Sequence, residues 1–356
     1  MPLSHAGGLS LDFIGQQIIP HDYRYEKTVV GGLSALDYNP DTGRFLAICD
    51  DRSKKNPARF YELQLDYDAD GFHKWAITNV QFLKQPDGTN FPKPVFFGKS
   101  TVDPEALKLS PNRNSYFWTS EGHAKHGVKP FIREMDLYGR YLRDFTLPEK
   151  YHLIKDKTGP RDNQAFEALT INHDHTTITV ATEGPLIQDG EAATAQKGAP
   201  VRFLHLDIKS GQPLHEYVYV VEPVHEETLP FGMTSISGVV DILSLGTHEY
   251  LVVERSFSAG SGLSVKLYLT DFTDATDVLA EDSLQNISYQ PAKKHLLLDL
   301  GTLGIDIDNI EGMSFGKRLA DGRRSLLLIS DDNFRSAQTT QILLFAVNDR
   351  SAKIPH

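Results

Sequence analysis

The stretch IEGMSFGKRLADGRRSLLLISDDN (310–333) decides the fold, because its pattern occurs in five places along the chain. A short apolar segment is followed by a polar turn, a second apolar segment and an acidic residue. Both apolar segments have the length and composition of β-strands. The other copies are GLSALDYNPDTGRFLAICDDR (32–52), DPEALKLSPNRNSYFWTSEGH (103–123), AFEALTINHDHTTITVATEGP (165–185) and ISGVVDILSLGTHEYLVVERS (236–256).

Further strand-like segments follow the copies. For example, PFIREMDL (130–137) is followed by the weaker GRYLRDFTLP (139–148). Repeated units of four strands, with almost no helical periodicity, are typical of a β-propeller. We therefore predict an all-β propeller of five blades. A six-bladed ring, with a divergent blade within 257–305, is the alternative.

The two ends of the chain are expected to close the ring together. The segment LSLDFIGQQIIP (9–20) resembles a fourth strand, whereas the last unit ends soon after its third strand, at LLFAVNDRSAKIPH (343–356). We expect the N-terminal strand to complete the last blade. The prediction is one propeller domain over 1–356, with a tail at 347–356 and units that start near 32, 103, 165, 236 and 310.

The composition narrows the function. The 356 residues carry a net charge of −11, which argues against nucleic acid as a partner because a phosphate backbone requires a basic surface. The single cysteine, Cys49, lies in an apolar run and is expected in the core. No apolar run of about 18 residues occurs, so we expect no membrane span. The N-terminus lacks a signal-peptide pattern, which fits a cytoplasmic protein or a mature exported form.

Two sets of repeated positions are predicted to meet at one mouth of the central channel. In a propeller the innermost strand lines the channel and the second strand runs antiparallel to it, so the start of one lies beside the end of the other. The second position of the copies is Ser34, Glu105, Glu167, Ser237 and Glu311. The acidic position after the second strand is Asp50, Glu121, Glu183, Glu254 and Asp331. The acidic set could be five copies of a turn residue that accepts backbone N–H bonds, whereas glutamates in only three units favour a site.

Carboxylates crowded around a narrow mouth favour a bound cation, because otherwise they repel each other. Calcium takes oxygen ligands of this kind, and the sequence has no His/Cys cluster of the zinc type. We predict a calcium site, with another divalent cation as the alternative. Asp51 and Asp332 are the second acids of the two DD pairs and are expected to mark the side of the mouth where the site lies. The predicted ligands are Glu105, Glu167, Glu311, Asp51, Asp332 and Glu183.

Basic side chains are predicted at the same mouth. Arg52, Arg255 and Arg335 lie in or next to the acidic strand ends, Arg161 precedes one repeat, and His123 follows another. These arginines could simply pair with the carboxylates. Alternatively, they could recognise a phosphate, because a guanidinium donates two parallel hydrogen bonds to it. On that interpretation the substrate-binding residues are Arg52, Arg161, Arg335 and His123.

The repeated elements resemble the phytase-like family, which is described by an esterase-like activity of phytase. The matching residues are GLSALDYNPDTGRFLAICDDR, DPEAL, FEALTIN with ATEGPL, VVERS, and NIEGMSFG with LLLISDDNF, and they extend over about 30–346. The resemblance implies a β-propeller that hydrolyses phosphoesters and that is periplasmic or secreted. The residues alone are also compatible with the cytoplasm.

Three functions are compatible with this pattern. The first is a monomeric, calcium-dependent phosphoesterase for a small anionic ester, with Glu105, Glu167, Glu311 and Arg255 as catalytic residues. The second is a calcium-dependent lactonase or carboxylesterase of the propeller type, in which Asn163 and Asn309 would contribute. The third is a binding propeller without turnover. An anionic substrate requires several basic groups at the mouth, whereas in a binding propeller every carboxylate would have a partner.

Overall fold

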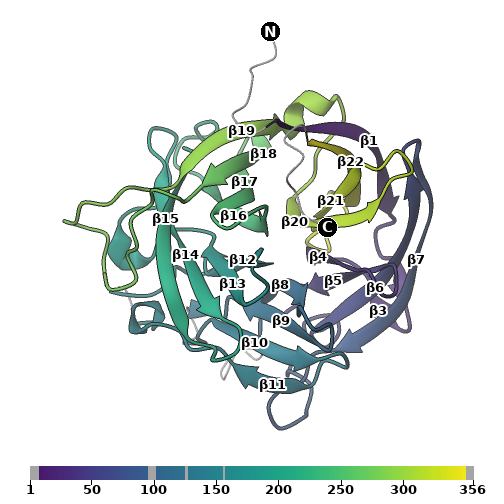
Figure 1. Cartoon of the computed structure of the whole chain (residues 1–356), viewed down its shortest axis with the longest axis horizontal. Helices are drawn as coiled ribbons and strands as arrows, with labels where there is room; N and C mark the ends of the chain where they lie inside the picture. Colours follow the sequence, from purple (N-terminus) through teal and green to yellow (C-terminus); the bar gives the residue numbers. More distant parts are fainter. Residues whose placement is uncertain (1–7, 95–101, 125–126, 155–156, 350–356) are drawn as a thin grey trace.

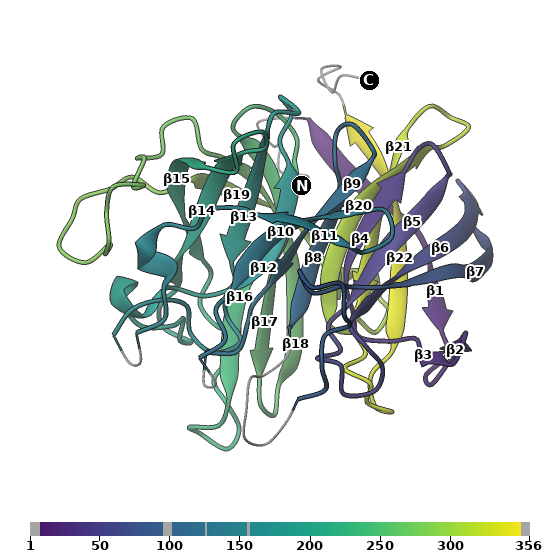
Figure 2. The ribbon, with the colours of Figure 1, turned by 90° about the horizontal axis from the view of Figure 1, so that it is seen from below.

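The computed structural model describes residues 8–94, 102–124, 127–154 and 157–349, and these residues form a five-bladed β-propeller. The strands form five four-stranded sheets. Figure 1 shows these sheets arranged around a central axis, and Figure 2 shows the ring from the side, with the small β2–β3 hairpin near β1. The prediction of an all-β, five-bladed propeller is confirmed.

In blades one to four, the strands follow one another in chain order from the channel outward. Each blade is antiparallel throughout, so short hairpins connect most of its strands. The strands are β4 (Leu33–Asn39), β5 (Arg44–Cys49), β6 (Arg59–Asp68) and β7 (Gly71–Phe82); β8 (Pro104–Leu109), β9 (Ser115–Ser120), β10 (Phe131–Asp136) and β11 (Tyr141–Asp144); β12 (Phe166–Ile171), β13 (Thr177–Thr182), β14 (Ala199–Asp207) and β15 (Pro213–Val221); and β16 (Ser235–Ser244), β17 (Glu249–Ser258), β18 (Gly262–Asp271) and β19 (Lys293–Asp299).

Blade five closes the ring with both ends of the described chain. Its strands β20 (Ile310–Arg318), β21 (Arg324–Ser330) and β22 (Thr340–Asp349) are completed by β1 (Leu9–Ile19), which pairs antiparallel with β22 from Leu9 to Ile19. The expected closing strand at 9–20 is therefore confirmed. The six-bladed alternative is wrong, because 257–305 contains the end of β17, then β18, β19 and the turn η4 (Leu300–Leu303), which all belong to or follow blade four.

The remaining elements are small and lie outside the sheets. They are β2 (Arg24–Tyr25), β3 (Thr28–Val29) and the short 3-10 turns η2 (Glu149–Tyr151) and η3 (Ile187–Asp189). Apolar side chains between neighbouring blades form the core, and Cys49 is fully buried among them. Burial of these side chains is the main source of stability for each blade, because an isolated sheet cannot cover its own faces.

One lysine connects the blades across the channel. Lys108 on β8 is buried, and its Nζ donates hydrogen bonds to the carbonyl oxygens of Leu36 on β4 and Met313 on β20, both at 3.0 Å. The same Nζ lies 3.7 Å from a carboxylate oxygen of Asp241 on β16. Burial raises the pKa of Asp241 to about 7, against the opposing effect of Lys108. Blades one, two, four and five thus share a single buried cation.

We expect Lys108→Met to lower the free energy of unfolding by about 3–5 kcal/mol, because Asp241 then remains buried without its cation. The loss should be larger at about pH 8 than at about pH 5, since Asp241 is protonated below its pKa and then needs no cation. Denaturant unfolding at both pH values measures this. The control Lys293→Met removes an exposed ion pair with Asp274 and should change stability by about 1 kcal/mol or less. A Lys108→Met protein as stable as this control would contradict the assigned role.

Candidate functional site

A β-bulge places a side chain at the channel mouth in most blades. The pairing of the first two strands passes from Leu33 to Ala35 in blade one, from Phe166 to Ala168 in blade three and from Ile310 to Gly312 in blade five. The skipped residues are the second positions of the repeat, Ser34, Glu167 and Glu311, and blade two has a similar irregularity around Glu105. Bulges re-aim side chains in this way, and both Glu105 and Glu167 line the cavity at the mouth.

In blade four the register differs from the sequence alignment. Val239 pairs with Glu254 and Asp241 pairs with Val253, so the bulged residue is Val240 instead of Ser237. Strand β17 also continues past Glu254 to Ser258. Glu254 is the partner of Val239, the residue before the bulge, and the next residue on β17 is Arg255. Arg255 therefore occupies the place that an acid has in the other blades.

A backbone bond identifies the equivalent ring residues independently. In four blades the backbone N–H of the ring residue donates to the carbonyl oxygen two positions before the bulged residue, and these ring residues are Asp50, Glu121, Glu183 and Asp331. In blade four the residue two positions before the bulged Val240 is Gly238, and its partner is Arg255. The ring around the mouth consists of Asp50, Glu121, Glu183, Arg255 and Asp331.

The predicted acidic set is therefore wrong in one of its five members. Glu254 faces away from the ring and bonds to the Nζ of Lys294 at 2.6 Å and to the hydroxyl of Tyr219. The alternative interpretation as a repeated turn residue also does not fit. Glu121 accepts from the Ala165 N–H in the next blade, whereas Asp331 accepts from Asn333 in its own loop. Among the described residues, the side-chain carboxylates of Asp50 and Glu183 accept no backbone N–H.

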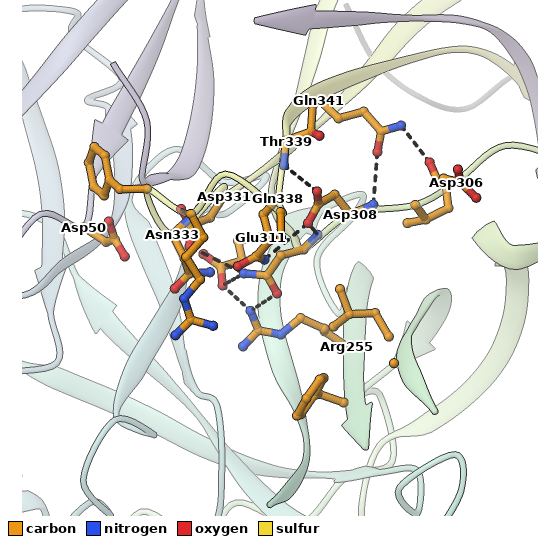
Figure 3. Close-up of a pocket in the computed structure, with 18 of the residues that line it drawn as sticks. Asp50, Arg255, Asp306, Asp308, Glu311, Asp331, Asn333, Gln338, Thr339 and Gln341 are labelled. Carbon is orange, nitrogen blue, oxygen red and sulfur yellow. Dashed lines mark hydrogen bonds and ion pairs between the residues drawn. The ribbon is translucent and has the colours of Figure 1, made fainter. Parts of the chain in front are cut away.

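Arg255 is the centre of the ion pairs at the mouth (Figure 3). Its Nη2 donates to Glu183 at 2.8 Å, and its Nη1 donates to the Asn309 side-chain oxygen at 2.7 Å and to Glu311. Asn309 also donates to Glu311 at 2.8 Å. One arginine in blade four thus joins carboxylates from blades three and five.

A second cluster lies in blade two. The buried side chains of Asp103, Glu105 and Glu121 place one carboxylate oxygen each within 4.8 Å of one another. Arg52 pairs with Asp103 and donates to Asn163. Of these three acids, only Glu105 was predicted as a ligand. Asp103 was missed, although it occupies the same place in its repeat as Asn309, two residues before the motif glutamate.

Burial and mutual repulsion shift the acids toward their protonated forms. Burial is the first cause in every case, and neighbouring carboxylates add to it. Burial raises the pKa of Glu183 to about 7, and Arg255 opposes this shift. The pKa is raised well above its ordinary value for Asp50, Glu105, Glu121, Glu167 and Asp331.

The carboxyl groups at the mouth outnumber the arginines that neutralise them. Eight carboxyl groups face two paired guanidiniums, those of Arg52 and Arg255, within the described residues. One oxygen each of Asp50, Glu121 and Glu183 is buried without a hydrogen-bond partner. A hard cation with oxygen ligands fits this donor set, because it would satisfy such atoms and offset the charge. The eight groups belong to Asp50, Asp103, Glu105, Glu121, Glu167, Glu183, Glu311 and Asp331.

Asp51 and Asp332, the second acids of the two DD pairs, accept hydrogen bonds that hold the loops at the mouth. Asp51 accepts the backbone N–H groups of Lys54, Lys55 and Asn56 and pairs with the buried Arg59 at 2.9 Å. Its oxygens therefore hold the β5–β6 loop. Asp332 holds the β21–β22 loop in the same way, because it accepts from the Gly32 and Phe334 N–H groups at 3.0 Å and lies 3.4 Å from His21.

The predicted basic residues divide into two groups. Arg52, Arg255 and Arg335 line the cavity, and Arg335 is exposed with no ion pair among the described residues. By contrast, Arg161 donates to the carbonyl oxygen of Gly190, and His123 lies 3.9 Å from Asp162, and neither lines the cavity.

Two further cations at the mouth were missed from sequence. The exposed Lys54 and Lys55 line the cavity in the loop that Asp51 organises, and Lys55 lies 5.0 Å from the centre of the Phe334 ring. The signal was present, since both lysines follow the acidic strand end in DDRSKK. The mouth therefore combines an acidic floor with a basic rim formed by Lys54, Lys55 and Arg335.

The loops at the rim have an unusual backbone conformation. Ser53, Asn163, Asn333 and Phe334 have positive φ angles of 58°, 59°, 46° and 51°. Such angles cost energy for residues other than glycine and occur frequently at ligand sites. Gly32 beneath this rim is required as glycine, because a Cβ atom there would lie 2.1 Å from Asp50 Oδ1.

A sequence model of a known protein family covers most of the chain. The sequence model of the family described as "Phytase-like: Esterase-like activity of phytase" matches residues 28–334. This chain belongs to the phytase-like family. The described residues contain no helix long and apolar enough to span a bilayer.

Individual proteins match this phytase-like protein either over part of the chain or at low sequence identity. An "Uncharacterized secreted protein" of Arthroderma benhamiae (strain ATCC MYA-4681 / CBS 112371) is 34% identical over 190 residues, which are 45% of this chain and 35% of that relative, so the match spans about a third of its length. The solved structure of the Dos1 propeller aligns with 88% of this chain and 68% of its own, at 7% identity and a TM-score of 0.37.

We expect the stability of the metal-free protein to fall as the pH rises from about 5 to about 8. The folded protein holds protons on acids with raised pKa values, such as Glu183 near 7, that the unfolded chain releases. Calcium should reverse this trend, since it binds the ionised carboxylates. At a hundredfold excess over its Kd it should add about 2.7 kcal/mol at the higher pH, and less at the lower pH. Thermal unfolding with calcium and with chelator measures this. A calcium effect that is equal at both pH values would contradict the assignment.

Proposed function

We propose that this phytase-like protein is a calcium-dependent hydrolase of phosphate esters, with its reacting centre at the channel mouth. The observation that carries the proposal is the excess of buried carboxylates with unpaired oxygens, beneath a rim of cations without ion pairs among the described residues. A phosphate needs both features, because it is drawn by the cations and would be repelled by the bare carboxylates unless a metal ion joins them.

The cation would be held by Asp103, Glu105 and Glu121, whose oxygens already lie close together. When bound, it would supply Lewis-acid chemistry by offsetting phosphoryl charge and lowering the pKa of water. The cavity above these residues has a volume of about 1550 Å³, enough for a small organic ester. Calcium is favoured because every ligand is a carboxylate oxygen.

Other side chains would bind and orient the ester. Lys54, Lys55 and Arg335 would attract the phosphate from solution. Arg255, fixed between Glu183 and Glu311, lines the cavity and would add positive charge beside the phosphate. Burial and the neighbouring carboxylates raise the pKa of Glu167 well above its ordinary value, so its carboxyl group would hold a proton for the departing alcohol.

The two alternative functions are less well supported. In a calcium lactonase Asn163 and Asn309 would help to hold the ion, but Arg52 and Arg255 occupy their side-chain oxygens. A binding propeller without turnover would leave no buried carboxylate oxygen unpaired, unlike Asp50 and Glu121 here. We also propose that the protein is exported, which the name of the matched secreted relative supports.

We expect hydrolysis of at least one phosphomonoester or phosphodiester in a panel that also includes lactones, and loss of this activity with a chelator. Glu105→Gln should lower kcat/KM by about 100-fold or more, because a ligand is lost. The matched control is Glu254→Gln, which changes an acid of the same repeat that faces away from the mouth and should retain activity within about twofold.

The proposed function would be wrong if lactones alone were cleaved, or if chelator and Glu105→Gln left phosphoester hydrolysis intact. Absence of turnover for every ester, in protein whose calcium binding has been verified by calorimetry, would favour the binding propeller.

A further inference from the structure

The cavity has an apolar wall on one side. Ile236, Phe257 and Leu263 line it from three adjacent strands of blade four. They are direct cross-strand partners, since Ile236 pairs with Phe257 and Phe257 pairs with Leu263. Directly paired residues share one face of a sheet, so these half-buried side chains form a continuous apolar row.

This wall adjoins the reacting centre. Arg255 precedes Phe257 by two residues on β17, and alternate residues of a strand face the same side of its sheet. The guanidinium that holds Glu183 and Glu311 is therefore the inner neighbour of the apolar row.

A second segment extends the wall and is held rigidly. Ile305 and Ile307 line the cavity between η4 and β20. Gln341 fixes this segment, because its side chain donates to the Asp306 carbonyl oxygen at 2.9 Å and accepts from the Asp308 N–H at 3.3 Å (Figure 3). The Thr339 N–H holds the Asp308 carboxylate in addition. A wall fixed by such bonds needs little ordering when a ligand binds.

The cavity is thus divided by polarity. The cations of the rim come from the loops of blades one and five, the acidic triad comes from blade two, and the apolar row comes from blade four. An alcohol covered with hydroxyl groups would lose hydrogen bonds with water against the apolar row, at a cost in free energy. An alkyl group placed there would instead gain from burial.

We infer that the substrate is an amphiphilic phosphate ester, whose phosphate lies over the acidic centre and whose apolar alcohol lies along Ile236, Phe257 and Leu263. This inference rests on the proposed function for the reacting centre. It adds the chemical class of the alcohol, which neither the family description nor the acidic ring specifies.

Apolar side chains are also exposed in the loop that bonds to the turn of this hairpin. The Leu229 N–H donates to the Ala259 carbonyl oxygen in the β17–β18 turn at 2.7 Å, and the same β15–β16 loop exposes Phe231 at 85% and Met233 at 56%. An amphiphile could therefore reach the wall as a dispersed molecule or from an assembled lipid surface. Both sources present the same phosphate and alkyl chemistry.

Binding of alkyl phosphonates tests the inference without turnover, since their carbon–phosphorus bond is not an ester. In calcium-loaded protein, the affinity from ethyl to octyl phosphonate, measured by calorimetry, should rise by about two- to fourfold per methylene until the wall is covered. Phe257→Ser and Leu263→Ser should flatten this series, with a much larger loss of affinity for octyl phosphonate than for ethyl phosphonate. The control Leu214→Ser, at an exposed position on β15, should retain the full slope.

Equal affinity for ethyl and octyl phosphonates, or an unchanged slope in both serine variants, would overturn the inference. Hydrolysis separates it from the proposed function. Cleavage of short and long alkyl phosphates at equal kcat/KM would refute the inference alone, whereas chain-dependent binding without any cleavage would refute the function alone. To separate the two sources, octyl phosphate is assayed dispersed and in phosphatidylcholine vesicles. If the substrate is drawn from a lipid surface, Phe231→Ser lowers turnover only with vesicles.

Discussion

The structure depends on one electrostatic constraint, the convergence of buried carboxylates from four of the five blades on a single channel mouth. A ring of equivalent positions brings them together, and closing the ring through β1 and β22 fixes their distances. Arg255 is the one ring member that is not an acid, and it joins Glu183 to Glu311 across three consecutive blades. A bound cation would offset the rest of the charge, because protonation keeps the acids neutral only below their raised pKa values.

The same constraint explains the division between structure and site. Acids that face the loops, such as Asp51 and Asp332, are satisfied by backbone N–H groups and shape the rim. Acids that face the axis, such as Glu105 and Glu167, have few protein partners. On the opposite side of the bulges, Lys108 supplies a protein cation to the channel itself. The fold therefore neutralises one level of its channel internally and leaves the level above it open to a ligand.

The sequence was sufficient for the propeller, the number of blades and the closing strand, because those follow from the periodicity of apolar and polar residues. It also placed Glu105 and Arg255 at the channel mouth, where the structure has them, but it did not place Asp103, Lys54 or Lys55 there. Asp103 was overlooked because its neighbour Glu105 carries the repeated motif, although both side chains enter the same cluster. Glu254 was misplaced because a bulge at Val240 changes the pairing without changing the apolar pattern. Register and side-chain direction are tertiary properties, so composition and spacing do not determine them.

The central claim is that a cation joins the acids of blade two. Diffraction from crystals grown with manganese in place of calcium tests it most directly, because anomalous scattering locates the ion without reference to the protein atoms. The account predicts an anomalous peak bounded by Asp103, Glu105 and Glu121, absent from crystals of Glu105→Gln grown in the same way. The absence of any anomalous peak at the mouth, or a peak bound only by surface acids, would contradict it.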